Sequence, residues 1–399
     1  MAWKVKEQEE KKERVNFDLM KCEWSVSHVR VLSEYCVSFN LRRLSQRLKV
    51  PKDFSLYTED GWVNIPAIAR LPAWLIVIIG KRQVGKTFGI LTHLIGENKH
   101  FMYWRRSEDE LEFISKNPEY NPFRAMQYHG WDIDIVRNGK HDYRIGWVEE
   151  RNEKGQPTKM QEIAPGVDIL TISKLRGFDG SAFTDIFFDE FIPERIVVQR
   201  KAEGDGVVSG YTTVCGNREL DGKPPLRMWM AANTNRINSP VLIAWGLLPL
   251  VEQLMRSKKE YLLTDEGVFI AMPQSQVITE KRAKTAAMRH LAKTDGAYYG
   301  MAMRNEFSYD SLQFVRPQSI RGMVPIMAAG TLYFYQNAGS LYVCGIRHNK
   351  RPTYQDTPED AIRCEMDYPE IRMLYNSGKI YFDSASSLLK FREYFGMKD

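Results

Sequence analysis

One segment limits the possible folds of this chain more than any other: Gly80 to Thr87, GKRQVGKT. It fits the pattern G-x-x-x-x-G-K-[ST] at every fixed position. The apolar run AWLIVII (residues 73–79) precedes it, and TFGILTHLI follows with the spacing of a helix. A glycine-rich loop between a buried strand and a helix directs successive backbone N–H groups to one place, where they bind phosphate. The segment therefore predicts a phosphate-binding loop; the alternative is a tight strand-to-helix turn that binds nothing.

Each residue type in this loop has a role in binding a nucleotide. Glycines let the backbone approach phosphate closely. Lys86 is expected to neutralise the β- and γ-phosphates, and Thr87 to offer its hydroxyl to Mg²⁺. The residues expected around the phosphates are Gly80, Lys81, Arg82, Gln83, Val84, Gly85, Lys86 and Thr87.

A second segment, TDIFFDEF (residues 184–191), is an apolar strand that ends in Asp189 and Glu190. In phosphoryl-transfer enzymes a strand-end Asp helps to hold Mg²⁺, and a neighbouring Glu can polarise the attacking water. A lone Asp-Glu pair is more often a solvated helix start, but here it follows a β-branched and aromatic strand. The D-x-x-G and N-K-x-D motifs of GTPases do not occur, so the sequence favours ATP over GTP.

Further polar residues follow other predicted strands. Asn233 ends RMWMAANTN and is placed either to sense the γ-phosphate or simply to cap the strand. Arg105 and Arg106 end HFMYWRR, and Arg218 lies in VCGNREL. An arginine that completes a phosphoryl-transfer site, from the same or a neighbouring subunit, is worth ~10³–10⁵ in rate. Surface positions without a catalytic role are the alternative for each arginine.

Predicted strands alternate with helices through the first two thirds of the chain. Such alternation is typical of an α/β fold with a mainly parallel sheet. Ser107 and Glu110 form a capping-box pattern at one helix start, and residues 130–165 resemble a hairpin insertion on the sheet rim. The strands are predicted at residues 73–79, 100–106, 167–173, 186–189 and 226–232.

The character of the sequence changes after Pro273. Residues 278–304 are basic and helical in pattern, LYFYQNAGSLYVCGI predicts a hairpin turning at residues 337–340, and SSLLKFREYF predicts a closing helix. The predicted organisation is an α/β domain at 1–272 with a helical N-terminal extension (1–60), a basic helical connector at 273–308, and a small α+β domain at 309–399.

Composition excludes several classes of protein. The longest apolar run, residues 72–80, is too short to cross a bilayer, and the basic and acidic N-terminus has no secretory signal pattern. The five cysteines are scattered and never spaced C-x-x-C, which predicts reduced thiols in a cytosolic compartment without disulfides or zinc. A formal charge of +6 permits a polyanionic partner.

The order of these motifs resembles the DNA-encapsidation ATPases of small short-tailed phages. The shared features are the strand and phosphate loop (IIGKRQVGKT), MYWRR, DIFFDEFIPE and MAANTN. The stretch SKLRGFDGSAFTDIFFDEF also resembles large terminase subunits. The resemblance covers about residues 72–250 and is weaker outside them.

This resemblance implies a P-loop ATPase core of the additional-strand, catalytic-glutamate class. It implies a homo-oligomeric ring of five around double-stranded DNA, at the capsid portal in the host cytoplasm, with an RNA scaffold left open. ATP and Mg²⁺ are the implied cofactors: Lys86 and Thr87 bind phosphate and metal, Asp189 completes the metal site, and Glu190 activates water. Arg105 would reach the nucleotide.

The resemblance implies that Arg218 acts on a neighbouring subunit. The family pattern V-x-R-N-R-E appears here as VCGNRE, so only its second arginine is present. The family's small C-terminal domain is ribonuclease H-like; here we expect it to dock and grip nucleic acid without nuclease activity. Of its acids, only Asp383 follows a predicted strand.

Other functions share a phosphate loop. A helicase-like translocase on single-stranded nucleic acid is the main alternative; a small-molecule kinase and a non-catalytic nucleic-acid clamp are others. For a DNA motor, Lys174 and Arg176 are candidate pore contacts.

Overall fold

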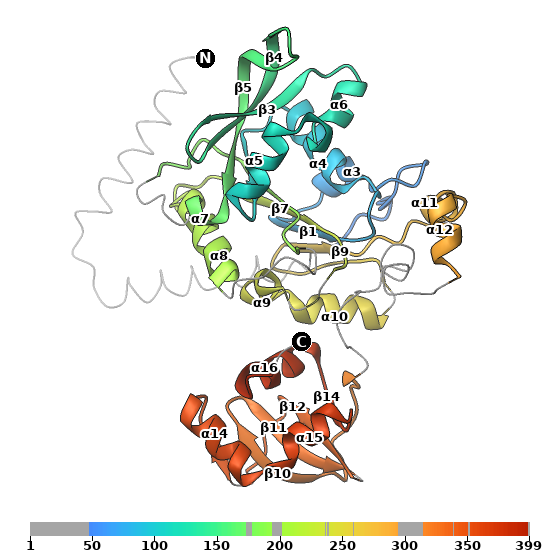
Figure 1. Cartoon of the computed structure of the whole chain (residues 1–399), viewed down its shortest axis with the longest axis vertical. Helices are drawn as coiled ribbons and strands as arrows, with labels where there is room; N and C mark the ends of the chain where they lie inside the picture. Colours follow the sequence, from blue (N-terminus) through green and yellow to red (C-terminus); the bar gives the residue numbers. More distant parts are fainter. Residues whose placement is uncertain are drawn as a thin grey trace, which may run out of the picture. The chain divides into compact units, whose positions relative to one another are not determined.

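The computed structural model describes residues 48–172, 178–193, 202–235, 237, 239–257, 259–293, 314–337, 339–349 and 352–397. Lys174, Arg176 and residues 1–47 of the predicted N-terminal extension lie outside these ranges, while residues 48–60 form turns and an isolated bridge rather than a helix. The described strands form two sheets, one of nine strands and one of five (Figure 1).

The nine-stranded sheet has the order β3-β4-β5-β2-β6-β7-β1-β9-β8. Its central strands, from β5 to β9, are parallel, as the α/β prediction requires. Their bounds are β1 (Leu75–Ile79), β2 (Phe101–Arg105), β6 (Asp185–Asp189), β7 (Arg227–Ala232) and β9 (Val268–Ala271), and the antiparallel β8 (Tyr261–Leu263) forms one edge.

Strand β1 shows why its sequence is apolar without interruption. All five residues are buried, because both faces of the sheet are covered. Ile76 and Ile78 pack into one hydrophobic cluster, whereas Leu75, Val77 and Ile79 pack into the cluster on the opposite face.

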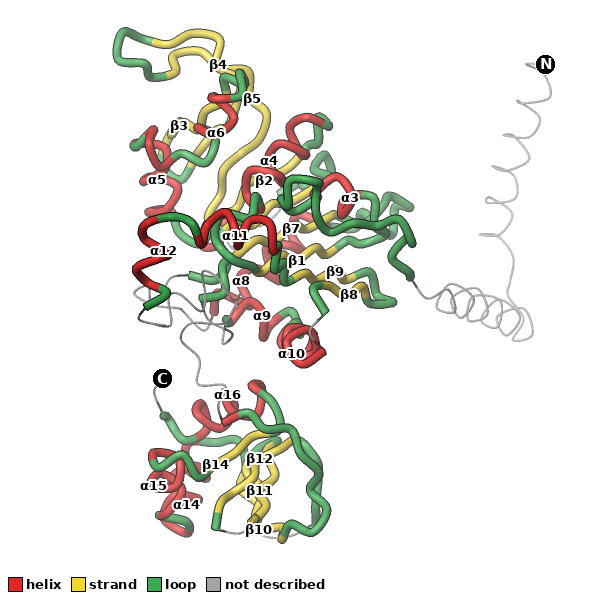
Figure 2. The backbone as a smooth tube through the Cα atoms, turned by 90° about the vertical axis from the view of Figure 1, so that its right-hand side faces the viewer, coloured by secondary structure: helices red, strands yellow, loops and turns green. Residues whose placement is uncertain are grey.

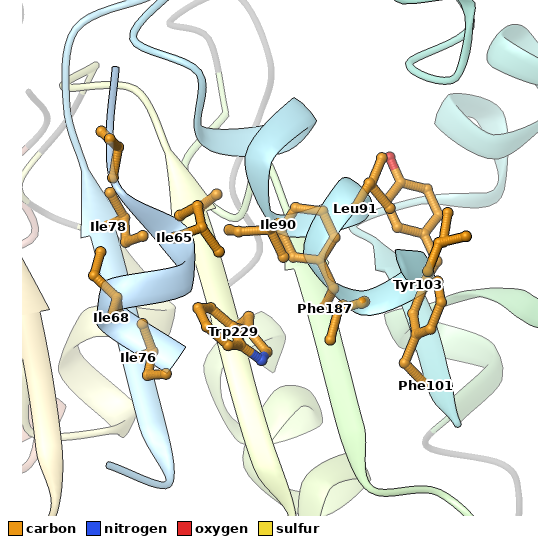
Figure 3. Close-up of a cluster of buried hydrophobic side chains, with 14 of the residues drawn as sticks. Ile65, Ile68, Ile76, Ile78, Ile90, Leu91, Phe101, Tyr103, Phe187 and Trp229 are labelled. Carbon is orange, nitrogen blue, oxygen red and sulfur yellow. The ribbon is translucent and has the colours of Figure 1, made fainter. Parts of the chain in front are cut away.

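The first cluster lies under α3 (Ile65–Ala69) and α4 (Lys86–Gly96). In Figure 3, Ile65 and Ile90 lie over Trp229 and the β1 isoleucines. The helices that contribute to this cluster also include α5 (Glu108–Lys116) and α6 (Arg124–Tyr128).

The opposite face is covered by a second set of helices (Figure 1). They approach one another closely at glycines in α8, which explains the glycine content of that helix. The helices are α7 (Ile169–Ile172), α8 (Ala202–Cys215), α9 (Pro240–Ala244) and α10 (Leu248–Ser257).

Strand β7 lies between β1 and β6 although it follows both in sequence. Ile79 pairs with Ala232, and Asp189 pairs with Ala231. Because the three strands are parallel and in this register, the residues after each strand meet at one edge of the sheet.

The rim of the sheet is an antiparallel insertion, as predicted for residues 130–165. It consists of β3 (Ile133–Gly139), β4 (Asp142–Arg151) and β5 (Pro157–Asp168), and the β4–β5 hairpin extends past the other strands (Figure 2). The last part of β5 also pairs in parallel with β2, which joins the insertion to the central strands.

The prediction of a strand at residues 167–173 holds for residues 167 and 168, which end β5, and is wrong for residues 169–172. The chain leaves β5 at Asp168 and forms α7. The Asp168 carboxylate accepts hydrogen bonds from the backbone N–H groups of Leu170 and Thr171 and from the Thr171 hydroxyl. This local capping by an aspartate starts a helix, and it overrides the strand propensity of VDILTIS.

Two short helices, α11 (Gln276–Ala283) and α12 (Ala286–Leu291), follow β9 in the basic segment. The second sheet has the order β13-β10-β11-β12-β14, with β11 and β12 forming the predicted hairpin. Its elements are β10 (Val324–Ala329), β11 (Leu332–Asn337), β12 (Ser340–Cys344), β13 (Thr353–Tyr354), β14 (Ile380–Phe382), α14 (Pro358–Asp367), α15 (Glu370–Asn376) and α16 (Ala385–Tyr394).

The domain boundaries at residues 272 and 308 stay predictions, as does the ribonuclease H-like class of the second sheet. In the described residues, no helix combines the length and apolar character needed to cross a membrane. Cys215, Cys344 and Cys364 are free thiols.

The close approach of α8 and α9 makes Gly204 a sensitive position. A Cβ there would lie 2.3 Å from the Pro240 carbonyl oxygen and 2.7 Å from Ala244 Cβ. We expect Gly204→Ala to lower the free energy of unfolding by about 1–3 kcal/mol, because overpacking outweighs the helix propensity of alanine. Chemical denaturation measures this. Gly206→Ala is the matched control, since its Cβ would meet only a side-chain methyl of Ile169 at 3.0 Å; equal destabilisation of both variants would contradict the steric explanation.

Candidate active site

The loop between β1 and α4 needs glycine at two places. Gly85, the residue before α4, has φ +86°, and a Cβ there would lie 3.3 Å from the Trp62 ring. A Cβ on Gly80 would lie 3.0 Å from Pro273. Positive φ and close neighbours both disfavour larger residues. The spacing of the sequence motif therefore reflects backbone shape at these two positions.

Lys86 places its ammonium group inside the loop. Nζ donates to the carbonyl oxygens of Gly80 (3.0 Å) and Lys81 (2.8 Å) and to Oδ1 of Asn233 (3.1 Å). The residue is 7% exposed. Burial lowers the pKa of Lys86, an effect that the charges of Glu190 and Asp189 oppose. The ammonium donates only to neutral oxygens, so an incoming anion would find a positive charge already in position.

Asp189 receives three side-chain hydrogen bonds at the end of β6. Thr87 Oγ1 donates to its Oδ1 at 2.8 Å, while the Tyr103 hydroxyl (3.1 Å) and Arg105 Nη1 (3.0 Å) donate to Oδ2. The hydroxyl and the carboxylate thus lie side by side at the helix start. Oxygen ligands of this kind fit Mg²⁺, which is usually held by one or two protein groups together with phosphates and water.

A metal site at this position would have few protein ligands. The described residues contain no group of three or more His, Cys, Asp or Glu side chains placed to hold a metal ion. A metal at Thr87 and Asp189 would therefore depend on a phosphate ligand for the rest of its coordination.

Glu190 is held by Asn233 at the tip of the neighbouring strand. Asn233 Nδ2 lies 3.2 Å from Oε1 and 3.3 Å from Oε2 of Glu190, while its Oδ1 accepts from Lys86. Glu190 has φ +54°, unusual for a residue other than glycine and a conformation that has an energetic cost. Burial first, and then the charge of Asp189, raise the pKa of Glu190. A less acidic carboxylate is a stronger base.

A chain of ion pairs leads away from Asp189. Arg105 Nε lies 3.1 Å from Glu110, whose other oxygen lies 3.6 Å from Arg106 Nη1. Arg106 Nη2 lies 2.8 Å from Glu203, at the start of α8. Ser107 caps α5 as the sequence predicts, by accepting from the Glu110 N–H, but the Glu110 side chain turns to the arginines instead of completing the capping box.

Arg218 lies away from this cluster. Its guanidinium donates to the carbonyl oxygens of Phe183 (2.5 Å), Pro224 (2.6 Å) and Ser181 (3.4 Å). Phe183 precedes β6, whereas Asp189 ends it, so Arg218 is at the opposite end of that strand. The structure therefore brings together Lys86, Thr87, Asp189, Glu190, Asn233 and Arg105, but not Arg218.

Sequence reasoning missed two groups at the site. Tyr103 lies two residues before Arg105 in β2, so strand alternation places both on one face, and this signal could have revealed it. Arg282 donates to the carbonyl oxygen of Arg82 (2.9 Å) from α11, 200 residues away in the chain. Nothing in the sequence pattern indicates that contact.

The partly buried carboxylate of Glu190 is expected to lower stability when it is ionised. Its pKa is raised in the folded state, so folding is disfavoured when the group is ionised, and this cost disappears as pH falls below the ordinary range of glutamate. We expect Glu190→Gln to raise the Tm by on the order of 2 °C at pH 8.5 and by less at pH 5. Thermal unfolding without nucleotide measures both values. Glu153→Gln, an exposed position, is the control; a Tm gain that grows toward acid pH would contradict this account.

No family model matches the sequence, and no curated protein matches it either. Solved structures do match. The viral genome packaging motor assembly of bacteriophage phi29 covers 86% of this chain and 100% of its own, with 19% identity and a TM-score of 0.58. The Phi-28 gp11 DNA packaging motor covers 86% of this chain and 99% of its own, with 14% identity and a TM-score of 0.52. At these identities the likeness is one of fold, and the resemblance noted in the sequence is confirmed at that level: the chain has the fold of viral DNA packaging motor proteins.

Proposed function

We propose that this chain is an ATP-hydrolysing motor subunit that moves double-stranded viral DNA through the portal into an empty capsid. The observation that carries the proposal is the meeting of Lys86, the Thr87–Asp189 pair and Glu190 at one sheet edge. These groups supply what phosphoryl transfer to water needs: a phosphate cradle, a place for Mg²⁺ and a base. The fold shared with two packaging motors supports DNA as the substrate that is moved.

The loop at residues 80–87 is assigned as a P-loop of the additional-strand, catalytic-glutamate class. The position of β7 between β1 and β6 supports this assignment. Lys86 binds the β- and γ-phosphates in place of its carbonyl contacts, and Thr87 and Asp189 hold Mg²⁺. When bound, Mg²⁺ neutralises charge that develops on the phosphate oxygens.

Glu190 accepts a proton from the attacking water. The water oxygen bonds to the γ-phosphorus, the bond from that phosphorus to the bridging oxygen breaks, and ADP and phosphate result. Asn233 orients the Glu190 carboxylate through its amide and touches Lys86 through its carbonyl oxygen. It therefore contacts both the base and the phosphate-binding ammonium, which supports its proposed role as a γ-phosphate sensor.

We assign to two arginines the stabilisation of the negative charge that develops on the phosphate oxygens during transfer. Arg105 acts within its own subunit, where it already contacts Asp189. The role of Arg218 on a neighbouring subunit stays a prediction; it requires the guanidinium to leave the carbonyl groups of Ser181, Phe183 and Pro224.

We propose a ring of five subunits at the portal vertex of the procapsid, in the host cytoplasm, with an RNA scaffold left open. Grip on DNA comes from phosphate contacts, because a packaging motor must accept every sequence. The basic helices α11 and α12 and the small second sheet, assigned as ribonuclease H-like without nuclease activity, are the proposed gripping and docking parts. Lys174 and Arg176 stay predicted pore contacts.

Steady-state ATP hydrolysis tests the proposal. We expect turnover of the wild-type chain to rise on addition of duplex DNA, and Glu190→Gln to lower stimulated turnover by at least about 100-fold, as expected when a general base is lost. Glu153→Gln, an exposed acid on the β4–β5 hairpin, is the matched control and should keep wild-type turnover.

The outcomes separate the candidate functions. Turnover stimulated by single-stranded but not duplex DNA would favour the helicase-like translocase. If neither form of DNA changes the rate of turnover, the motor proposal is refuted and the chain is an ATPase that acts on another substrate. An active Glu190→Gln variant would remove Glu190 as the base.

A further inference from the structure

Helix α11 is attached to two consecutive residues of the phosphate loop. Lys81 Nζ donates to Thr279 Oγ1 at 2.9 Å, and Arg282 Nη1 donates to the carbonyl oxygen of Arg82 at 2.9 Å. Thr279 and Arg282 are three residues apart and therefore lie on one face of the helix. That face of α11 is directed at the loop.

The segment before α11 fixes the position of the helix. Pro273 packs against Gly80, and β9, which ends two residues earlier, pairs with β1. Ser275 is 3% exposed and caps α11 by accepting from the Ile278 N–H (3.3 Å). The helix is therefore anchored to the strand that leads into the loop.

Positive charge is concentrated where α11 meets the loop. Lys81 is 5% exposed, and its ammonium donates to a hydroxyl. Burial first, and then the charge of Arg282, lower the pKa of Lys81. Arg82 and Arg282 also contribute to lowering the pKa of Lys86. Glu260 attracts Lys81, and Glu190 and Asp189 attract Lys86, while the four cations repel one another; a phosphate bound among them would add further negative charge.

Arg282 meets the loop at Arg82, within the segment Gly80 to Thr87 that is expected to surround the phosphates. Lys86, proposed above to bind the β- and γ-phosphates, lies in the same loop and donates to the carbonyl oxygens of Gly80 and Lys81, the residues before Arg82. Thr87 and Gly85, at the start of α4, belong to the other end of the loop. A guanidinium has five N–H donors in a planar fork, so one such group can donate to a backbone carbonyl and to a phosphate together.

We propose that Arg282 binds the terminal phosphate of a nucleoside triphosphate, so that α11 distinguishes a triphosphate from a diphosphate. This inference rests on the proposed nucleotide site but not on the DNA load. It gives the segment between the two sheets a direct contact with the part of the nucleotide that hydrolysis removes. Arg282 is thereby a specificity-determining residue supplied from outside the strand-and-loop motifs.

Binding of a non-hydrolysable ATP analogue and of ADP, each with Mg²⁺ and without DNA, tests the inference. We expect Arg282→Ala to weaken the triphosphate analogue by about 10- to 100-fold, the range for a charge-assisted hydrogen bond, and to change ADP affinity by less than about threefold. Arg282→Lys should restore part of the triphosphate affinity. Lys281→Ala removes one charge from an exposed neighbouring position and should leave both affinities unchanged.

Equal loss of both nucleotides in Arg282→Ala would show that Arg282 only supports the loop, and unchanged triphosphate affinity would overturn the proposal outright. If Arg282→Ala fails to fold, Arg282→Lys decides: it should weaken the triphosphate analogue alone. Because no DNA is present, a wild-type chain that binds nucleotide but ignores DNA would refute the motor and leave this inference intact. A wild-type chain that binds neither nucleotide would refute both.

Discussion

The pairing of β7 between β1 and β6 is the constraint on which the rest of the site depends. Parallel register aligns Ile79 with Ala232 and Asp189 with Ala231, so the next residues of three strands emerge at one edge. Asn233 can then touch both Lys86 and Glu190 with a single amide. A shift of one residue in either pairing would turn these side chains to the opposite face. Burial of the strands on both faces makes such a shift costly.

The site itself is unfavourable for folding. Asp189 and Lys86 are almost completely buried and the adjacent Glu190 is partly buried, so each of these charges would be more stable in water. Hydrogen bonds reduce the cost: Asp189 has three side-chain donors and Lys86 has three acceptors. Glu190 is less well supported and has a positive φ. The surrounding apolar clusters stabilise this arrangement, which is why strained and charged groups can persist at a functional edge.

Much of the fold and site could be predicted because their signals are local. The phosphate loop, the buried strands and the hairpin at residues 337–340 are each set by a few neighbouring residues. The path of the chain at Asp168 could not be predicted, because a single capping carboxylate starts a helix where the sequence favours a strand. The anchoring of Arg218 to carbonyl groups and the approach of Arg282 to the loop join residues far apart in sequence. Periodicity contains no information about such contacts.

The ion pairs from Asp189 to Glu203 have a consequence for how the two ends of the sheet are connected. Positive and negative groups alternate along this row, so a change of charge at one member alters the balance at the next. Its far member sits on the first turn of α8, and Arg218 follows the last turn of the same helix. Helix α8 therefore runs from the sheet edge where Asp189 lies toward the end of β6 at which Arg218 is held. The row of ion pairs and α8 together form one continuous path from Asp189 to the region of Arg218.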